Sequence, residues 1–262
     1  MIIVKVGGQK GINYDFVLKD FAKQKDILLV HGGKGVLEEI STKLGKPPVW
    51  VETASGFTSR RTDRETLDMF TMVYAGKQNK MIVEKLQALG VNAVGMCGMD
   101  GKSVIAKRKN IKIVENGKKK ILRDDYTGKI IQVNPELIRL LIENGFSPVV
   151  CPPALSEDNE PLNVDGDRMA AEIAKSFKAD TVIYLSNVPG LLKNKDDEST
   201  LIKEINKDNV EDFMQFAQGT MKKKVMGAME AVEAGVSKVV FADARIENPI
   251  TNALNGKGTV IQ

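Results

Sequence analysis

The sequence predicts an α/β fold built on an open, mainly parallel, doubly wound sheet. Six short runs rich in β-branched residues recur along the chain and alternate with segments of helical periodicity. Because these runs are apolar throughout instead of alternating with polar residues, they are typical of parallel strands that are buried on both faces. The alternation of such strands with helices favours a parallel sheet that is covered by helices on each side.

The expected elements follow from these runs in chain order. Strands are expected at 2–6, 26–31, 92–97, 147–152, 181–186 and 238–243. The residues Thr62–Glu65 have the form of a capping box, which predicts the start of a long helix that reaches about Leu89. Asn134, as an N-cap before Pro135, predicts a second helix that Gly145 ends. A later helix is expected to bury a stripe formed by Val225, Ala228, Met229 and Val232.

The composition is that of an ordinary globular chain. With 262 residues, of which 42% are hydrophobic and 27% charged, the chain is long enough for two lobes around a substantial core. No apolar run approaches the ~20 residues that a membrane span needs, and the run at 2–6 is too short for a signal-peptide core. We therefore expect a cytoplasmic protein without a membrane partner, in which Cys97 and Cys151 are free buried thiols.

The net charge of +4 is concentrated in one segment. Residues 102–129 contain ten Lys or Arg and three Asp or Glu, a local balance of +7 that leaves −3 for the rest of the chain. An Asn116-Gly117 turn between β-leaning runs predicts that this segment is a projecting antiparallel hairpin. Tyr126 is the only aromatic residue there, which gives nucleic-acid bases little to stack on, so a nucleic-acid partner is not expected.

Two expected strands end in glycine pairs that are suited to phosphate. Gly7-Gly8 follows the first strand, and Gly32-Gly33 follows the second and leads into a helix. Beyond the carboxyl ends of parallel strands, glycines allow the backbone N–H groups to approach an anion closely. Neither loop fits the dinucleotide pattern G-x-G-x-x-G, and the segment 95–103 lacks the first glycine of a P-loop. Phosphate groups are therefore expected at the glycine pairs.

Five ordered motifs indicate the wider family. They are "KVGG" at 5–8, "VHGGKG" at 30–35, "NVDGD" at 163–167, "LSNVPGLL" at 185–192 and "GTMKKKV" at 219–225. Together they resemble the amino acid kinase family, and most closely its N-acetylglutamate kinase group. The stretch 55–80 resembles a subgroup of kinases whose substrate is 2-aminoadipate or glutamate attached through its amino group to the small acidic carrier protein LysW.

The resemblance implies an activity and a division of the chain. Residues 1–178 would form an N-terminal lobe for substrate and for homodimer contacts, and 179–262 a C-terminal lobe for ATP. The kinase would transfer the γ-phosphoryl group of ATP, with Mg²⁺ on the ATP oxygens, to the side-chain carboxylate of carrier-linked L-2-aminoadipate or L-glutamate, in lysine biosynthesis and, as a second pathway, arginine biosynthesis. Two alternatives stay open: an N-acetyl-L-glutamate 5-kinase of arginine biosynthesis, and a basic nucleic-acid-binding or regulatory protein on a kinase-like scaffold.

The resemblance also implies catalytic roles. Lys5 and Lys224 would contact the transferring phosphoryl group, and Asp167 would hold their ammonium groups in place. Lys5 is also notable without the resemblance, because a lysine in a buried strand is costly unless it is paired. The spacing of the motif favours Lys224 over Lys222 and Lys223. The backbone N–H groups expected to bind phosphate are those of Gly7, Gly8, Gly32 and Gly33.

The remaining site residues are implied in the same way. The substrate would contact Gly33, Lys34, Arg60 and Asn163, with Arg60 preferred over Arg61 for the α-carboxylate. Lys34 stands where the family often has glycine, so its side chain either adds an anion contact or turns outward. His31 is expected to pack beside the glycine loop without an acid–base role. The nucleotide would lie against Ser186, Asn187, Gly190 and Leu191. Docking of the acidic carrier is expected on Lys107, Arg108, Lys109, Lys118, Lys119 and Lys120.

Overall fold

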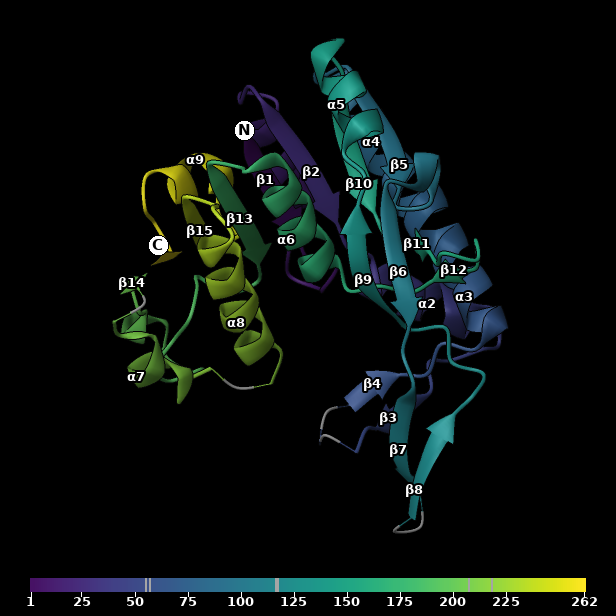
Figure 1. Ribbon diagram of the computed structural model, residues 1–262. Coiled ribbons are helices and arrows are strands. Elements are labelled where there is room, and N and C mark those ends of the chain that lie inside the picture. Colours follow the sequence, from purple (N-terminus) through teal and green to yellow (C-terminus); the bar gives the residue numbers. More distant parts are fainter. Residues whose placement is uncertain (55, 57, 116–117, 207, 218) are drawn as a thin grey trace.

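The main body of the protein is a long twisted sheet between two layers of helices (Figure 1). The computed structural model describes residues 1–54, 56, 58–115, 118–206, 208–217 and 219–262. The expected Asn116-Gly117 turn lies outside the described residues, as do the side chains of Lys118 and Lys119. In the part of the chain that is described, no helix is both long and apolar enough to cross a membrane.

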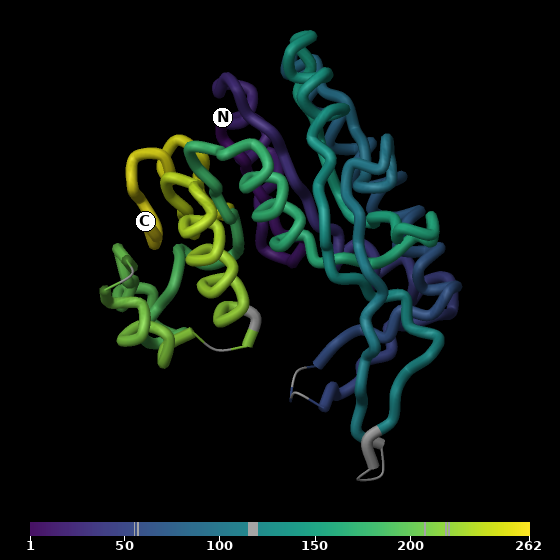
Figure 2. The backbone as a smooth tube through the Cα atoms, viewed as in Figure 1, coloured from purple at the N-terminus to yellow at the C-terminus, as the bar shows by residue number. Residues whose placement is uncertain are grey.

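Within the described residues the main sheet has eight strands. In spatial order they are β14 (Glu204–Ile205), β16 (Thr259–Ile261), β15 (Lys238–Asp243), β13 (Thr181–Ser186), β1 (Ile2–Val6), β2 (Ile27–His31), β10 (Ser147–Cys151) and β5 (Ala93–Cys97). All pairings are parallel except the pairing of β15 with β16. The six expected strands are all present, and the first strand lies at the centre of the molecule (Figure 2).

Helices cover both faces of this sheet, so the expected doubly wound fold class is confirmed. One face packs against α1 (Tyr14–Phe21), α4 (Asn79–Ala88) and α9 (Pro249–Leu254). The other face packs against α5 (Glu136–Glu143), α6 (Gly166–Phe177) and α8 (Gly219–Glu233). The expected stripe of α8 is directed into this second layer, where Val225, Ala228 and Met229 are buried and Val232 is partly buried.

A third apolar cluster supports the region where β2 ends. It is formed by α2 (Lys34–Lys43), α3 (Arg64–Thr71) and a π-helical segment, Met72–Gln78, that joins α3 to α4. The long helix is therefore present, but its expected capping box is wrong. Asp63 is the N-cap and accepts a hydrogen bond from Thr66 N, whereas Thr62 is fully buried and has other partners.

The basic segment 102–129 does not project as a whole. At its two ends, β6 (Val104–Arg108) and the start of β9 (Gly128–Val133) pair with each other in a second sheet that also contains β11 (Ala154–Leu155) and β12 (Pro161–Leu162). They stay with the body because β6 buries Val104, Ile105 and Ala106. Only the inner hairpin projects, formed by β7 (Ile111–Glu115) and β8 (Lys118–Leu122) (Figure 1).

The hairpin is joined to a second small pair of strands. β3 (Trp50–Glu52) and β4 (Thr58–Arg60) are antiparallel, and the chain after β3 pairs with β7 through a Thr53–Ile113 bridge and the hydrogen bond from Ala54 N to Lys112 O (2.7 Å). The remaining described helices are short: α7 (Val210–Met214) and 3₁₀ turns at Asp100–Lys102 and Glu198–Thr200. The division into lobes at residue 178 and the homodimer stay predictions.

Three smaller expectations have different outcomes. Asn134 is not an N-cap, because its side-chain amide donates to Lys102 O (2.7 Å) and Pro135 takes the cap position of α5. The end of α5 is as expected, since Gly145 follows it with φ 78°. Cys97 and Cys151 are neighbours on β5 and β10 and are free and buried, so the expected thiols are confirmed.

Candidate active site

Two lysines and one aspartate meet at the carboxyl edge of the main sheet. Lys5 comes from β1, Asp167 from the first turn of α6, and Lys224 from α8. Lys5 Nζ lies 2.6 Å from Asp167 Oδ1, and Lys224 Nζ lies 3.0 Å from Asp167 Oδ2. The structure thus brings together the three residues that are distant in the sequence, and it separates Lys224 from the exposed Lys222.

The surroundings keep Asp167 charged. Burial by itself would raise the pKa of Asp167, but the ammonium groups of Lys224 and Lys5 outweigh burial and hold that pKa well below its usual range. Tyr184 on β13 also contacts the triad: its hydroxyl donates to Asp167 O (3.1 Å), and its ring centroid lies 5.6 Å from Lys224 Nζ. The result is two ammonium groups that are fixed by a single carboxylate.

The two glycine loops lie against each other beside the triad. A Cβ atom on Gly8 would lie 2.5 Å from Gly33 N and 2.6 Å from Lys34 N, so only glycine permits this approach. Gly7 N donates to Leu185 O (3.0 Å) and Gly32 N donates to Val6 O (3.0 Å). The N–H groups of Gly7 and Gly32 therefore continue the hydrogen bonding between neighbouring strands and already have acceptors.

His31, at the end of β2, is placed as a structural residue. It is fully buried, and burial lowers its pKa to about 4, so the ring is neutral at physiological pH. Nδ1 lies 3.0 Å from Gly32 O and Nε2 lies 3.1 Å from Asn79 Nδ2. Because a carbonyl only accepts and an amide nitrogen only donates, Nδ1 carries the proton and Nε2 accepts.

A second group of charges gathers at the far end of the glycine loops. Arg60 Nη2 is 2.9 Å from Glu38 Oε1, and the guanidinium carbon lies 5.3 Å from the centre of the Trp50 ring. Lys34 Nζ approaches the same ring to 4.8 Å and Glu38 to 4.0 Å. Arg61 points elsewhere and pairs with Asp124. The side chain of Lys34 therefore turns toward Arg60, not away from the site.

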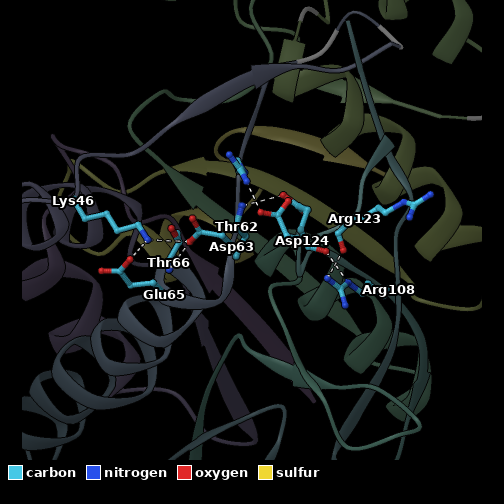
Figure 3. A network of polar contacts seen from close by, with 10 residues as sticks. Lys46, Thr62, Asp63, Glu65, Thr66, Arg108, Arg123 and Asp124 are labelled. Carbon is cyan, nitrogen blue, oxygen red and sulfur yellow. Dashed lines mark hydrogen bonds and ion pairs between the residues drawn. The ribbon is translucent and has the colours of Figure 1, made fainter. Parts of the chain in front are cut away.

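Asn163 is held in a polar network that joins the start of α3 to the base of the hairpin. Thr62 and Arg108 of this network are labelled in Figure 3. Its side-chain amide donates to Thr62 Oγ1 (3.0 Å). Thr62 N and Thr127 N each donate to the buried carboxylate of Asp125, at 2.9 Å. Arg108 completes the network: Nε donates to Asp125 O (2.8 Å). This network fixes Asn163 relative to the segment that carries Arg60.

The expected nucleotide residues follow β13. Ser186 Oγ donates to Val188 O (3.3 Å), and Asn187 is tied to the first glycine loop through Lys10 O (3.4 Å). Leu191 is 2% exposed and its N–H donates to Thr259 Oγ1 (2.8 Å). Gly190, where a Cβ would lie 2.5 Å from that same oxygen atom, is needed for close packing. Ser186 and Asn187 therefore lie at the end of β13 near the first glycine loop, whereas Gly190 and Leu191 are packed in the interior.

The basic residues expected to dock a carrier lie in different settings. Arg108 is turned inward, against the Tyr126 ring at 4.1 Å and Glu160 at 3.4 Å. Lys107 is exposed, and Lys109 lines a groove of about 600 Å³ between the hairpin base and Lys223 of α8. Lys120 lines a separate groove of about 810 Å³ between β3 and the hairpin.

Several site residues were not expected from the sequence. Trp50 and Glu38 sit with Arg60 and Lys34, and Thr62 and Asp125 hold Asn163. Only Trp50, the single tryptophan of the chain, carries a signal that could have been noticed. In the described residues no group of three or more His, Cys, Asp or Glu side chains is arranged to hold a metal ion.

A parallel sheet whose edge presents two glycine loops beside a fixed pair of ammonium groups is suited to phosphoryl transfer. The fold and the site together are those of a small-molecule kinase. The sequence profile of the amino acid kinase family matches residues 1–243, and the chain belongs to this family.

Relatives of similar length have known names. The chain is 51% identical over 269 residues to "[LysW]-aminoadipate kinase" of Thermus thermophilus, covering 100% of both chains. It is 52% identical over 266 residues to the protein of the same name from Deinococcus radiodurans, covering 100% of this chain and 91% of the relative. It is 38% identical to the "[LysW]-aminoadipate/[LysW]-glutamate kinase" of Metallosphaera sedula, covering 100% of both chains.

Solved structures agree on the fold. The protein smu.665 of Streptococcus mutans has a TM-score of 0.74 at 22% identity, covering 100% of this chain and 98% of that one. The Giardia carbamate kinase has a TM-score of 0.66 at 17% identity, covering 99% and 97%. The amino acid kinase fold is therefore confirmed.

Proposed function

We propose that this protein is an ATP-dependent kinase that phosphorylates the side-chain carboxylate of carrier-linked L-2-aminoadipate in lysine biosynthesis, with carrier-linked L-glutamate as a second substrate. The observation that carries this proposal is the triad of Lys5, Asp167 and Lys224 beside the two glycine loops. Full-length similarity to kinases named for this substrate supports the choice of acceptor.

The geometry supports a mechanism without a general base. A carboxylate is already ionised and nucleophilic at neutral pH, so no proton has to be removed. The only histidine is buried, neutral and bonded to the backbone. Lys5 and Lys224 would stabilise the charge that develops on the transferring phosphoryl group, and Asp167 would keep both ammonium groups in place.

The phosphate chain of ATP would bind at the glycine loops. The amides of Gly8, Gly33 and Lys34 converge where these loops meet, and Lys34 opens α2, whose N-terminus favours an anion. We assign the phosphate contacts to these three N–H groups, because those of Gly7 and Gly32 extend the strands. Mg²⁺ would arrive on the ATP oxygens and supply charge neutralisation there. The base and ribose would lie against Ser186 and Asn187.

The acceptor would bind at the opposite end of the loops. Arg60 is positioned to take a carboxylate and is paired with the carboxylate of Glu38, which a substrate anion would replace. Lys34 adds a second positive charge over the same Trp50 ring. Asn163, fixed by Thr62, would contact the group attached to the α-carbon.

An acidic carrier would dock beside β3 and the hairpin. The groove of about 810 Å³ combines apolar side chains such as Val51 and Ile121 with Lys120 and Arg123. Positive charge around an apolar centre suits an acidic protein surface, because complementary charge steers the encounter. The second groove is lined by Lys109 and by Lys223, the residue before the proposed catalytic Lys224.

The proposed function is tested by trapping the acyl phosphate with hydroxylamine. The acceptors are the carrier protein ending in 2-aminoadipate, the carrier ending in glutamate, N-acetyl-aminoadipate and N-acetyl-L-glutamate. We expect kcat/KM to be at least 100-fold higher for the aminoadipate-bearing carrier than for either free N-acetyl compound. Efficient turnover of free N-acetyl-L-glutamate would instead identify an N-acetylglutamate 5-kinase. RNA binding without turnover of any acceptor would favour a nucleic-acid-binding protein.

Carrier docking is tested by charge reversal in the groove. We expect the double variant Lys120→Glu/Arg123→Glu to raise KM for the carrier-linked substrate about 10- to 100-fold, since each reversal replaces attraction by repulsion at the interface. Turnover of a free N-acetylated acceptor should be unchanged. The matched control is Lys19→Glu/Lys257→Glu, which changes the net charge equally at two exposed positions. An equal effect of both double variants would show that only the overall charge matters.

A further inference from the structure

The π-helical segment Met72–Gln78 lies directly behind the second glycine loop. In an α-helix, with 3.6 residues per turn, side chains five positions apart point to different sides. A π-helix bonds residue i to i+5, so its wider turn brings such side chains to the same side. Tyr74 and Asn79 are five apart, and both face this loop. The Tyr74 ring lies 3.0 Å from where a Cβ on Gly33 would be.

Asn79 has an unusual place for a polar residue. It is fully buried and contacts three strands of the main sheet. Its amide nitrogen lies 2.9 Å from Val149 O on β10 and 3.1 Å from His31 Nε2 on β2. On β5, a Cβ atom on Gly95 would lie 1.9 Å from Asn79 Oδ1, so the glycine is required for Asn79 to fit.

A chain of two hydrogen bonds runs from Asn79 to the loop. The Asn79 amide donates to His31 Nε2, which leaves the proton on Nδ1, and Nδ1 donates to Gly32 O (3.0 Å). The Gly32 carbonyl belongs to the peptide unit that contains Gly33 N. Fixing this carbonyl therefore fixes the direction of the Gly33 N–H group, because the peptide bond is planar.

We infer that Asn79 is a positioning residue for phosphoryl transfer, which acts through His31 and the Gly32 carbonyl to aim the Gly33 N–H group at the phosphate. This inference rests on the proposed function, in which that N–H group binds the phosphate chain of ATP. The π-helical segment, which ends at Gln78, brings Asn79 to the same side of the helix as Tyr74. Neither Asn79 nor His31 has to touch a substrate in this role.

The first test is a double-mutant cycle on kcat. Asn79→Ala and His31→Ala should each lower kcat about 10- to 100-fold, as expected for a small misplacement of a transition-state contact, with KM for the acceptor nearly unchanged. If Asn79 acts through His31, the double variant should be no slower than the slower single variant. Multiplied effects in the double variant, or wild-type kcat in a folded Asn79→Ala protein, would overturn the inference.

The second test is the pH profile of Asn79→Asp. A carboxylate at position 79 needs a proton on Nε2 while Nδ1 still donates to Gly32 O, so it should raise the pKa of His31. Lys5 on β1 and Lys80 on α4 act in the opposite direction, because their positive charges disfavour a protonated His31. Two further ionisable groups lie nearby. Asp167 on α6 is paired with Lys5, and the Cys151 thiol on β10 contacts Asn79.

Activity of Asn79→Asp should therefore be highest at acid pH and should fall as the pH rises through the raised His31 pKa. The wild-type profile should show no such step, since its His31 pKa of about 4 lies below the assay range. A flat profile for a folded variant of reduced kcat would contradict the role of His31. If this variant does not fold, the double-mutant cycle decides alone.

The control for stability is Asp20→Ala. Asp20 is also fully buried and accepts hydrogen bonds from Ile250 N (2.7 Å) and Thr251 N (2.8 Å) at the start of α9. Its loss should lower Tm but leave kcat unchanged well below Tm.

If the wild-type protein turns over no acceptor, the proposed function fails. Wild-type turnover with unaffected Asn79 variants would overturn only the inference about Asn79.

Discussion

Replacement of Lys224 with alanine is expected to lower kcat about 100- to 1,000-fold while the protein stays folded. The ammonium group lies 3.0 Å from Asp167, and in the proposed function it stabilises the charge that develops on the transferring phosphoryl group. Loss of one preorganised donor to such a charge typically costs this much in rate. Acyl phosphate trapped with hydroxylamine, at saturating ATP and acceptor, measures the effect.

The neighbouring lysines provide a matched control. Lys222 is exposed on the same helix, so Lys222→Ala should keep nearly all activity. Lys5→Ala should behave like Lys224→Ala, because Lys5 Nζ contacts the other oxygen of the same carboxylate. Near-wild-type kcat in Lys224→Ala would show that a different lysine faces the phosphoryl group.

The sequence was informative wherever a local pattern has one physical cause. Continuous apolar runs predicted the six central strands, because a parallel strand that is covered on both faces tolerates few polar residues. Lys5 was noticed for the same reason, as a charge inside such a run. Its partner Asp167 lies far along the chain, and the resemblance to the family, not the spacing, brought the two together.

Tertiary contacts determine the features that the sequence predicted wrongly, namely the helix cap at Asp63 and the extent of the projecting hairpin. Thr62 fits a capping box, but its side chain serves the buried network with Asn163, so Asp63 caps the helix instead. The basic segment fits a hairpin along its whole length, but buried residues of β6 keep its outer part in the body. Such outcomes depend on contacts with residues that are distant in the sequence, and a local sequence pattern does not reveal those contacts.

The cluster around Arg60 shows the same limit at the site itself. Lys34 could point toward substrate or away from it, and the sequence had no means to decide. The structure places it over Trp50, beside Arg60 and Glu38. These residues come from α2, β3 and β4, and the sequence of each segment alone does not predict that the three come together.

Replacement of Asp167 with asparagine is expected to lower both kcat and stability. An amide carries no charge, so the ammonium groups of Lys5 and Lys224 would repel each other without a counter-ion in a site where their side chains are 9% and 16% exposed. We expect a loss of kcat of about 100-fold or more, because both lysines lose their position. Urea unfolding should show a loss of about 3 kcal/mol near neutral pH, at the low end for breaking a buried pair because Asp167 is partly exposed.

The pH dependence of that difference tests whether the charge of Asp167 is the cause. The pKa of Asp167 is depressed in the folded protein, so its contribution to stability is fully present above the unfolded value of about 3.9 and is lost as the pH falls toward the folded value. Below pH about 4 the advantage of the wild-type protein over Asp167→Asn should therefore shrink by about 1.4 kcal/mol per pH unit. A difference that stays constant between pH 7 and pH 3 would mean that the carboxylate acts through packing, and the two lysines would then need another source of their fixed position.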